Sequence, residues 1–471
     1  MPTEFSTRAG QALGNEGVRR HIRRAMDGLV AKRRLAFPDE DELADLRQRG
    51  KAIRDHALAR LPDLLLELER ACERNGIHVH WAEAVEEGNT IVLDILRQHG
   101  AELVIKGKSM VSEEMGLNHF LATQGIQALE TDLGEFILQL AGEAPSHIIV
   151  PAIHKDRAQV AALFASHFPE IPPSDDIDGL TATARRVIRE HFAQAIAGLS
   201  GVNFAIAETG TLCLVENEGN GRLCTTAPQV HIALCGIEKV IARLDQLPPL
   251  LTLLTRSATG QPITTYVNMI SGPRQEAELD GPRAVHLVLL DNGRSRIYGD
   301  HQLRSTLRCI RCGACINHCP VYARLGGHAY GTVYPGPIGS VLEPQLQGLD
   351  RRGELAEASS LCGACGEVCP VRIPLPDLLR RLRAEGVKAG EDSQVLGRGP
   401  GPKPLHRLIW GLWRHVHTTP HLYRWLTLLA TRLRWLLPTG LGPWARTRVA
   451  PTLAPRSLHE LARAENFPDE E

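Results

Sequence analysis

The chain has 471 residues, of which 43% are hydrophobic and 23% charged, and its formal net charge is −1 at pH 7. This length allows roughly two or three domains with sizeable cores, and the near-neutral charge argues against a nucleic-acid partner. The N-terminal stretch 1–17 is polar, and no stretch has the about 18 uncharged apolar residues that a membrane span needs, so we expect a cytoplasmic protein.

Residues 1–75 are predicted to form an N-terminal helical segment. They are rich in Arg, Glu, Leu and Ala, and the stretch 61–76 (LPDLLLELERACERNG) has apolar residues at helical spacing followed by a glycine stop. Cys72 falls inside this helix and is interpreted as a core residue, because an isolated cysteine in an apolar helix face behaves as a small hydrophobe.

Between residues 76 and 298, short β-branched runs alternate with helical stretches. Strands are predicted at 102–106, 126–131, 147–153, 203–216, 230–236, 264–270 and 284–290, and helices at 112–122, 133–142, 181–196 and 238–254. Such alternation predicts an α/β domain with a mainly parallel sheet. Cys213, Cys224 and Cys235 lie on or beside these strands and are interpreted as buried core residues.

The loop KGKSMVSEE (106–114) carries two lysines and follows a predicted strand. It resembles the end of a nucleotide-binding P-loop, but the preceding glycine, Gly100, lies too far before Gly107 for that pattern, so no nucleotide is assigned. The loop opens a predicted helix with acidic residues in its first turn. It is therefore either an anion-binding loop or a solvated lysine loop.

Seven of the eleven cysteines lie in two runs between residues 309 and 369. The first run, CIRCGACINHCP, has the spacing of the bacterial ferredoxins that hold two [4Fe–4S] clusters, and the second, LCGACGEVCP, is a shortened copy. In such proteins three closely spaced thiolates bind three iron corners of one cluster, while the cysteine before the proline binds the other cluster. Seven thiolates in this pattern predict two iron–sulfur clusters.

This crossover assigns four cysteines to cluster one and three to cluster two. Cluster one receives Cys309, Cys312, Cys315 and Cys369, and cluster two receives Cys319, Cys362 and Cys365. Val368 stands where we expect an eighth cysteine, so cluster two is either [3Fe–4S], or [4Fe–4S] with one iron bound by water, substrate or another side chain. Nearby side chains that could serve are His318, Ser360 and Glu367. Structural zinc and disulfides are less favoured, because zinc uses four ligands and the chain shows no secretory signal.

Residues 299–390 are therefore predicted to form a helical, ferredoxin-like domain with two clusters. The link between the runs contains GGHAYGTVYPGPIG (326–339), whose glycines and prolines predict a loop around the clusters with Tyr330 and Tyr334 shielding them. The stretch 371–386 after the last cysteine resumes a helical pattern.

The C-terminal extension, residues 391–471, is basic and rich in tryptophan. From Ser393 to His459 it contains no Asp or Glu, ten Lys or Arg and five of the six tryptophans, and two helices are predicted at 405–416 and 421–437. Such a segment docks on a partner subunit, lies on a membrane surface, or folds back on its own domain.

These motifs together resemble the lactate-utilisation protein B family, whose members carry a so-called LUD domain. The matching stretches run from about residue 70 to 385 and include VIKGKSMVSEEMGLN, ETDLGEFILQLAGEAPSHIIVPAIHK, AIAETGTLCLVENEGNGR, VHLVLLDNGR, CIRCGACINHCPVYARLGGHAYGTVYPGPIG and SSLCGACGEVCPVRIPL. The resemblance implies an α/β LUD fold related to sugar-phosphate isomerases and CoA transferases. It also implies that the seven cysteines bind two [4Fe–4S] clusters. Gly107 departs from the family's usual serine.

The resemblance further implies a role in oxidising L-lactate to pyruvate within a three-protein complex. Because the chain shows no flavin or nicotinamide fingerprint, we expect an electron-transfer subunit that receives electrons from lactate through partner subunits. Two alternatives remain open. The LUD domain could bind an anionic metabolite while the clusters sense redox state, or an open iron of cluster two could bind lactate directly as a Lewis acid. No catalytic side chain is predicted.

Overall fold

The computed structural model describes residues 4–388, 392–393, 396–399, 401, 404–435 and 452–465. The chain divides into two compact units, Met1–Pro400 and Gly401–Glu471, and each is described by itself. The α/β region and both cysteine runs lie in the first unit, and the basic helices lie in the second.

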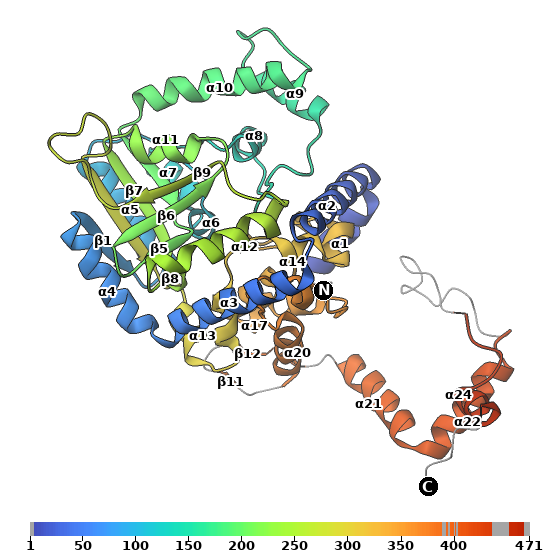
Figure 1. Ribbon diagram of the computed structural model, residues 1–471. Helices are drawn as coiled ribbons and strands as arrows, with labels where there is room; N and C mark the ends of the chain where they lie inside the picture. The colour runs from blue at the N-terminus through green and yellow to red at the C-terminus, as the bar shows by residue number, and fades with distance from the viewer. Residues whose placement is uncertain are drawn as a thin grey trace. The chain divides into compact units, whose positions relative to one another are not determined.

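The first unit is built around a six-stranded parallel sheet with the strand order β1-β10-β7-β4-β2-β3. Figure 1 labels two of these strands, β1 and β7. Every pair of neighbours is parallel, which confirms the predicted sheet type. All seven residues of the central strand β7 are buried, as expected for a parallel sheet covered on both faces. The strands are β1 (Ile77–Ala82), β2 (Leu103–Lys106), β3 (Gln127–Glu130), β4 (Ala197–Gly201), β7 (Val230–Gly236) and β10 (Ala284–Leu290).

The order of the strands reverses between β2 and β4. The chain moves from β2 outward to β3, and later from β4 through β7 to β10 on the other side. In open parallel sheets, ligands bind in the crevice beyond the carboxyl ends of the strands at such a switch point. The topology therefore directs attention to the loops that follow β2 and β4.

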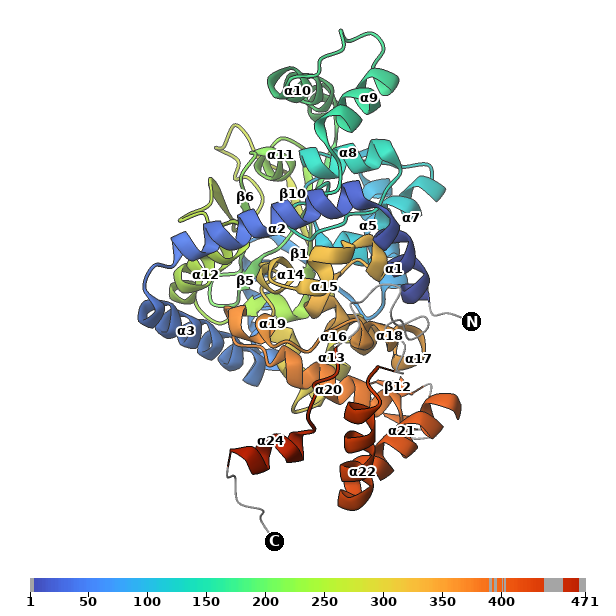
Figure 2. The ribbon, with the colours of Figure 1, turned by 90° about the vertical axis from the view of Figure 1, so that its right-hand side faces the viewer.

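Helices and a second sheet complete the α/β region. The second sheet has the order β8-β5-β6-β9 and contains β5 (Phe204–Ile206), β6 (Thr211–Glu216), β8 (Val240–Ile241) and β9 (Tyr266–Ile270). The remaining elements are α5 (Val85–Gln98), α6 (Met110–Glu114), α7 (Leu117–Thr123), α8 (Leu133–Ala141), α9 (Arg157–His167), α10 (Ile177–Gln194), α11 (Asn220–Thr226), η1 (Ile237–Lys239), η2 (Leu244–Gln246), α12 (Leu247–Thr259) and α13 (Arg294–Gly299). Helices α9 and α10 lie at the end of the unit farthest from the cysteine runs (Figures 1 and 2).

The cysteine runs belong to a helical region that shares one hydrophobic core with the rest of the unit. That core continues from the N-terminal helices through the second sheet to the cysteines and the helices that follow. The region contains η3 (Leu303–Arg308), α14 (Ala314–Asn317), α15 (Pro320–Leu325), η4 (His328–Tyr330), α16 (Gly336–Gln347), α17 (Leu349–Arg352), α18 (Glu354–Glu357), α19 (Ala364–Val368), α20 (Leu375–Gly386), β11 (Asp392–Ser393) and β12 (Gly397–Arg398).

Several predictions differ from the structure. The helix expected at 238–254 begins only at Leu247 as α12, and the residues before it form η1, the short strand β8 and η2. The run 147–153 is a turn, because the Nδ1 atom of His147 accepts hydrogen bonds from the Ile149 and Val150 amides while Ile148 packs against the first cysteine loop. The link between the cysteine runs contains the twelve-residue helix α16, with Pro344 inside it. Strand β4 was missed because its Gly-rich sequence is untypical of strands, and a side chain at Gly198 would collide with the Cys224 carbonyl at 1.9 Å.

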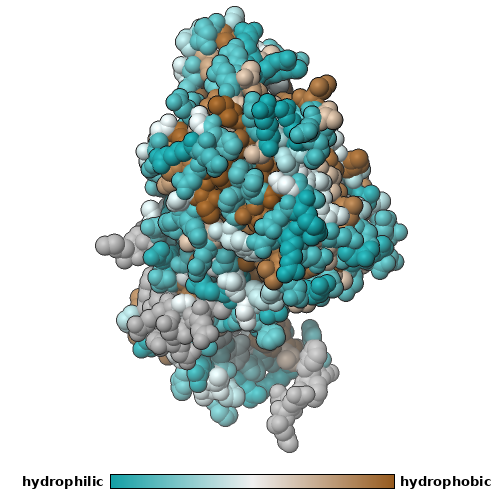
Figure 3. Space-filling view, turned by 90° about the vertical axis from the view of Figure 1, so that its left-hand side faces the viewer, coloured by the Kyte–Doolittle hydropathy of each residue, from teal (hydrophilic) through white to brown (hydrophobic). Residues whose placement is uncertain are grey.

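Four helices precede the sheet and bind the two regions together: α1 (Glu4–Gly14), α2 (Glu16–Ala36), α3 (Glu40–Ala59) and α4 (Leu61–Arg74), as the sequence predicts. Helix α2 runs alongside α14 and α15 (Figure 2). The face of the molecule seen in Figure 3 is mainly hydrophilic, with smaller apolar patches between the polar side chains.

The second unit contains the two predicted basic helices, α21 (Pro404–Thr418) and α22 (Pro420–Arg432), and α24 (Leu458–Ala464). The last two residues of the helix expected at 421–437 lie outside the described residues. Trp410, Trp413, Trp425 and Trp435 are all more than half exposed. Within the described part of the chain, no helix is long and apolar enough to cross a bilayer.

Arg54 of α3 joins the N-terminal helices to both other regions. Its guanidinium, 1% exposed, donates to the carbonyl oxygens of Val240 (2.9 Å), Leu307 (3.0 Å), Arg308 (3.3 Å) and Glu238. Burial lowers the pKa of Arg54 to about 10, so the group remains charged at neutral pH.

We predict that Arg54→Met lowers the free energy of unfolding by about 3 kcal/mol, because buried carbonyl groups lose their donor. Denaturant unfolding followed by circular dichroism measures this. The control Arg20→Met removes an exposed guanidinium (74% side-chain exposure) and should change stability by less than about 0.5 kcal/mol. Equal effects of the two variants would contradict the bridging role of Arg54.

Candidate functional site

The two cysteine loops have the same backbone conformation. In the first loop Arg311 and Gly313 have positive φ angles of 59° and 73°, and fifty residues later Leu361 and Gly363 have φ angles of 55° and 89°. A short helix follows each pair directly, α14 in the first loop and α19 in the second. Positive φ at a residue other than glycine costs energy, so its recurrence marks one structural motif used twice.

This repeat corrects the position of the missing cysteine. An offset of fifty residues pairs Cys312 with Cys362, Cys315 with Cys365, Cys319 with Cys369, and Cys309 with Ser359. The second run therefore lacks a counterpart of Cys309, the first cysteine of the first run. Ser359, and not Val368, stands at the eighth position, because the second run keeps the spacing of the last three cysteines of the first.

Four of the seven cysteines line one small enclosed cavity. They are Cys309, Cys312, Cys315 and Cys369, and the other walls are mainly apolar, from Ile148, Ile310, Ile338, Val371, Ile373 and Leu375. Burial raises the pKa of Cys315, and the neighbouring Cys309, Cys312 and Cys369 raise it further. The structure thus brings together the set that the crossover pattern assigns to cluster one.

The other three cysteines form a second group. Burial raises the pKa of Cys365 to about 12, and Cys319 and Cys362 contribute to this rise. Cys319 and Cys365 are buried, whereas Cys362 is exposed. Tyr330, which is buried, forms a hydrogen bond with Cys319 that helps to lower the pKa of this thiol against the effect of burial. Cys365 of this group also helps to raise the pKa of Cys315 in the first group. The two cysteine groups are therefore neighbours.

Both groups fit iron–sulfur clusters. Backbone N–H groups point at three of the sulfurs: Arg311 N at Cys309 Sγ (3.4 Å), Tyr322 N at Cys319 Sγ (3.4 Å) and Ile373 N at Cys369 Sγ (3.3 Å). Clustered thiols with N–H···S contacts and apolar walls are the donor set such clusters use. None of the eleven cysteines is in a disulfide, and among the residues that the structure describes no His, Cys, Asp or Glu group is arranged for a single metal ion.

Cations from distant parts of the sequence surround the first cysteine group. Arg47 Nε donates to the Cys369 carbonyl (3.0 Å), and Arg33 Nη2 donates to the Val368 carbonyl (3.3 Å). The negative charge of Cys309 helps to raise the pKa of each of three cations, Arg54, Lys239 and Arg311. Apart from Arg311, which lies within the first cysteine run, these residues could not be found from the sequence, because α2, α3 and η1 meet the cysteines only after folding.

A buried network of charges connects this group to the sheet. Glu238 accepts hydrogen bonds from Arg294 (2.7 Å) and Arg311 (3.2 Å), and these cations hold its pKa at about 2 against the effect of burial. Arg294 also forms a two-pronged pair with Glu114 (2.7 and 2.8 Å), which accepts from the Tyr334 hydroxyl (2.7 Å). Tyr334 therefore lies in this network, while Tyr330 contacts the second cysteine group.

A cavity of about 310 Å³ lies on the sheet side of the network, and we call it the strand-end cavity. Gly107 to Val111, which follow β2, and Val202 and Asn203, which follow β4, line it, as the switch point of the sheet predicts. Lys239 and Arg311 line it from the side of the first cysteine group. The predicted lysine loop thus borders a cavity, with Lys108 donating to the Ile149 carbonyl.

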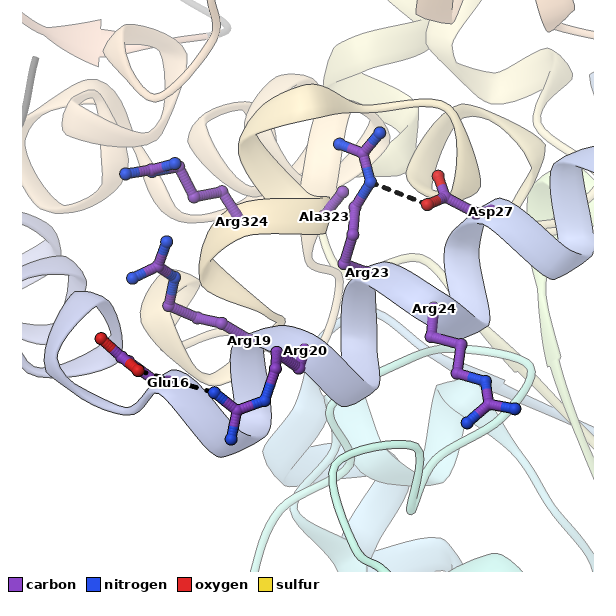
Figure 4. A pocket seen from close by; sticks show the side chains of 8 residues that line it. All are labelled: Glu16, Arg19, Arg20, Arg23, Arg24, Asp27, Ala323 and Arg324. Atoms are coloured by element: carbon purple, nitrogen blue, oxygen red, sulfur yellow. Dashed lines mark hydrogen bonds and ion pairs between the residues drawn. The ribbon is translucent and has the colours of Figure 1, made fainter. Parts of the chain in front are cut away.

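An arginine-rich surface lies beside the helix that starts at Cys319. Helix α2 and Arg324 of α15 border a shallow pocket of about 640 Å³, lined by Arg19, Arg20, Arg23, Arg24, Arg324, Ala323, Glu16 and Asp27 (Figure 4). Only two of the five arginines pair with its carboxylates, Arg20 with Glu16 (3.5 Å) and Arg23 with Asp27 (2.9 Å). This arginine surface is therefore net positive.

Three protein families match successive parts of the chain: the LUD domain at residues 65–290, the 4Fe-4S dicluster domain at 305–373 and the C-terminal region of lactate utilisation protein B at 381–467. Lactate utilization protein B of Bacillus velezensis is 42% identical over 89% of this chain and 86% of its own length. The chain belongs to the lactate utilization protein B family. The expected family and fold class, an α/β LUD domain with a 4Fe-4S dicluster domain, are thus confirmed.

Other proteins similar to this family member include the "Uncharacterized electron transport protein YkgF" of Escherichia coli, 43% identical over 84% of this chain and 83% of its own. A solved structure of a DUF162 family protein from Deinococcus radiodurans matches 49% of this chain and 98% of its own, with 15% identity and a TM-score of 0.28. The 4Fe-4S domain makes this chain an iron–sulfur protein of lactate utilisation.

We predict that Cys319→Ala removes the EPR signal of cluster two and spares that of cluster one, and that Cys369→Ala does the reverse, because each cysteine reaches across to the other group. Iron and sulfide analysis of anaerobically purified variants accompanies the spectra. Cys213→Ala, a buried cysteine of β6 outside the motif, is the control and should change neither signal. Loss of the cluster nearest in sequence in both variants would exclude the crossover.

Proposed function

We propose that this chain is the electron-transfer subunit of a complex that oxidises L-lactate to pyruvate. The observation that carries the proposal is the pair of neighbouring cysteine groups in one hydrophobic core, one enclosed and one reaching the surface at Cys362. The names of the relatives, lactate utilization and electron transport, support the same role.

The seven cysteines are the proposed ligands: Cys309, Cys312, Cys315 and Cys369 for cluster one, and Cys319, Cys362 and Cys365 for cluster two. When bound, each cluster supplies a one-electron carrier whose potential depends on burial, charge and hydrogen bonds to sulfur. The protein contributes N–H groups at the sulfurs, the guanidinium groups of Arg33, Arg47, Arg54 and Arg311, and the Tyr330 hydroxyl. Because these groups stabilise negative charge, we expect them to favour the reduced state.

The arrangement suggests an order for the two sites. The enclosed cysteine group lies against the strand-end cavity through Arg311, which lines both cavities. The second group is the one with an exposed cysteine, Cys362. We therefore propose that electrons enter near the α/β domain and leave from the second group.

We further propose that the complex contacts this chain at two surfaces. One is the exposed tryptophan face of α21 and α22, which the sequence offered for a partner subunit or a membrane surface. The other is the arginine surface, which suits an acidic redox partner because charge complementarity speeds association.

The test is lactate-dependent reduction of the anaerobically purified protein, followed by EPR. We predict no reduction of the chain alone, because it has no hydride-accepting cofactor motif, and reduction within minutes once the two partner proteins are added. Reduction of the isolated chain by L-lactate would instead support direct oxidation at an open iron and would contradict the subunit role. D-lactate is the control substrate.

The same assay examines the two contact surfaces. A chain ending at Pro400, the last residue of the first unit, should keep both cluster signals but lose reduction through the partners, since α21 and α22 are absent. Arg20→Glu with Arg24→Glu should slow reduction, more strongly at low salt, because screening weakens the attraction. Full reduction in both variants would remove these surfaces from the proposal.

A further inference from the structure

Ser359 occupies in the second cysteine loop the place that Cys309 occupies in the first. Each lies three residues before the next cysteine of its loop and two residues before the residue with positive φ. The hydrogen bonding is also the same. The Arg311 amide donates to Cys309 Sγ at 3.4 Å, and the Leu361 amide donates to Ser359 Oγ at 3.1 Å. The hydroxyl oxygen of Ser359 therefore has the same position in the second loop as the sulfur of Cys309 has in the first.

The position of Ser359 is held from two sides. Its carbonyl oxygen accepts a hydrogen bond from Arg383 Nη2 of α20 at 2.6 Å, and its hydroxyl accepts from Leu361. The other side chains considered for this role are placed less well. Ser360 and Glu367 are exposed, and His318 Nδ1 is engaged with the Ala314 carbonyl at 2.9 Å. None of these three is the counterpart of a cysteine in the first loop.

We propose that Ser359 Oγ is the fourth protein ligand of cluster two. The inference rests on the proposed assignment of Cys319, Cys362 and Cys365 to that cluster. On binding, the hydroxyl proton passes to solvent and an oxygen–iron bond replaces the oxygen–hydrogen bond, with no change in oxidation state. An oxygen is a harder ligand than a thiolate, so this corner should be held less firmly than a cysteine-bound corner.

The test compares Ser359→Ala and Ser359→Cys with Ser360→Ala, a matched change at the neighbouring exposed serine. Iron analysis and EPR are done on anaerobically purified protein before and after mild oxidation. We expect Ser359→Ala to lose about one iron per chain and to show a [3Fe–4S] signal without added oxidant. Ser359→Cys should resist oxidation more than the wild type, and Ser360→Ala should behave as the wild type.

Two results would overturn the assignment. Equal iron content and equal oxidation rates in Ser359→Ala and wild type would mean that water or another group holds the corner. Loss of iron in Ser360→Ala and not in Ser359→Ala would move the ligand by one residue. Both readouts are independent of lactate oxidation, and the three-cysteine assignment is tested separately by the cysteine variants.

A second, independent observation concerns the strand-end cavity, where the buried ammonium of Lys239 is attracted by Glu238 and Cys309 but is paired with neither. Lys239 is 7% exposed, and within the described part of the chain its ammonium makes no hydrogen bond or ion pair. The two carboxylates nearby are already paired, Glu238 with Arg294 and Arg311, and Glu114 with Arg294. Burying a cation without a counter-charge is costly, so the charge balance of this wall favours an anion.

The lining of the cavity also includes carboxylates that accept hydrogen bonds from backbone donors. Glu216 accepts from the amides of Glu218 (3.0 Å), Gly219 (2.5 Å) and Arg222 (3.4 Å), and Glu218 accepts from the Leu133 amide (3.2 Å). Asp132 caps α8 by accepting from the Glu135 amide (3.2 Å). An anion in the cavity is therefore directed to the wall of Lys239 and Arg311.

We infer that the strand-end cavity binds a small 2-hydroxy or 2-oxo monocarboxylate through Lys239. This deepens the proposed function, on which the choice of substrate class rests. A volume of about 310 Å³ is at the lower end for ligand pockets and suits such a molecule. The competing explanation is that Lys239 only balances the negative charge of Cys309 and its cluster.

Calorimetric titration of the anaerobically purified full chain, without partners, separates the two explanations. The probes are L-lactate, pyruvate and oxamate, with sulfate as an unrelated anion. We expect Lys239→Met to weaken carboxylate binding at least about tenfold, the loss of one charge-assisted contact. Lys155→Met, the same change at a lysine paired with Glu143 outside the cavity, should bind as the wild type does.

Absence of binding by the wild type, or unchanged binding by Lys239→Met, would overturn the inference in favour of charge balance for the cluster. Sulfate binding as tightly as the carboxylates would overturn the substrate class. Because no electron transfer is needed, binding can persist if the lactate-reduction assay fails, and the two failures are therefore distinguishable.

Discussion

The guanidinium of Arg54 is the contact on which the arrangement of the first unit depends. A single side chain from α3 satisfies carbonyl groups in η1, in β8 and in η3, which leads into Cys309. The cysteine region has no separate hydrophobic core and shares one core with the second sheet. Because four buried acceptors converge on one donor, the α/β domain and the first cysteine loop are fixed in one orientation.

That fixed orientation places a chain of buried charges between the strand-end cavity and the first cysteine loop. The carboxylate of Glu238 is the centre of an alternating series, with Arg294 and Glu114 on one side and Arg311 on the other. Arg311 adopts a left-handed backbone within the first cysteine loop and extends its side chain into the strand-end cavity, over the ring of Tyr334 (4.7 Å). A ligand in the cavity and a cluster at Cys309 therefore share an arginine, so the charge of one acts on the other.

Local sequence patterns predicted the strands and the cysteine loops well. The contacts between segments distant in the sequence could not be predicted. The cysteine spacing encodes its own loop geometry, and the apolar runs of β7 and β10 encode buried parallel strands, so both were found from sequence. The run 147–153 has the composition of a strand, but His147 folds its backbone into a turn against the first cysteine loop. Lys239 and Arg47 had no signal, because only tertiary structure brings them to the cysteines. Ser359 did have one: aligning the two runs at an offset of fifty residues shows it opposite Cys309.

The exposure of Cys362 has a consequence for damage. The second cysteine group reaches the surface, while the four cysteines of the first are walled in by the common core. Oxidants would therefore reach the proposed cluster two at Cys362 without the protein opening, although Cys319 and Cys365 belong to the common core. The injured chain would keep its fold and both proposed contact surfaces and would still occupy its place among its partners. Oxidative injury would then inactivate whole assemblies, and activity would fall faster than the amount of folded protein.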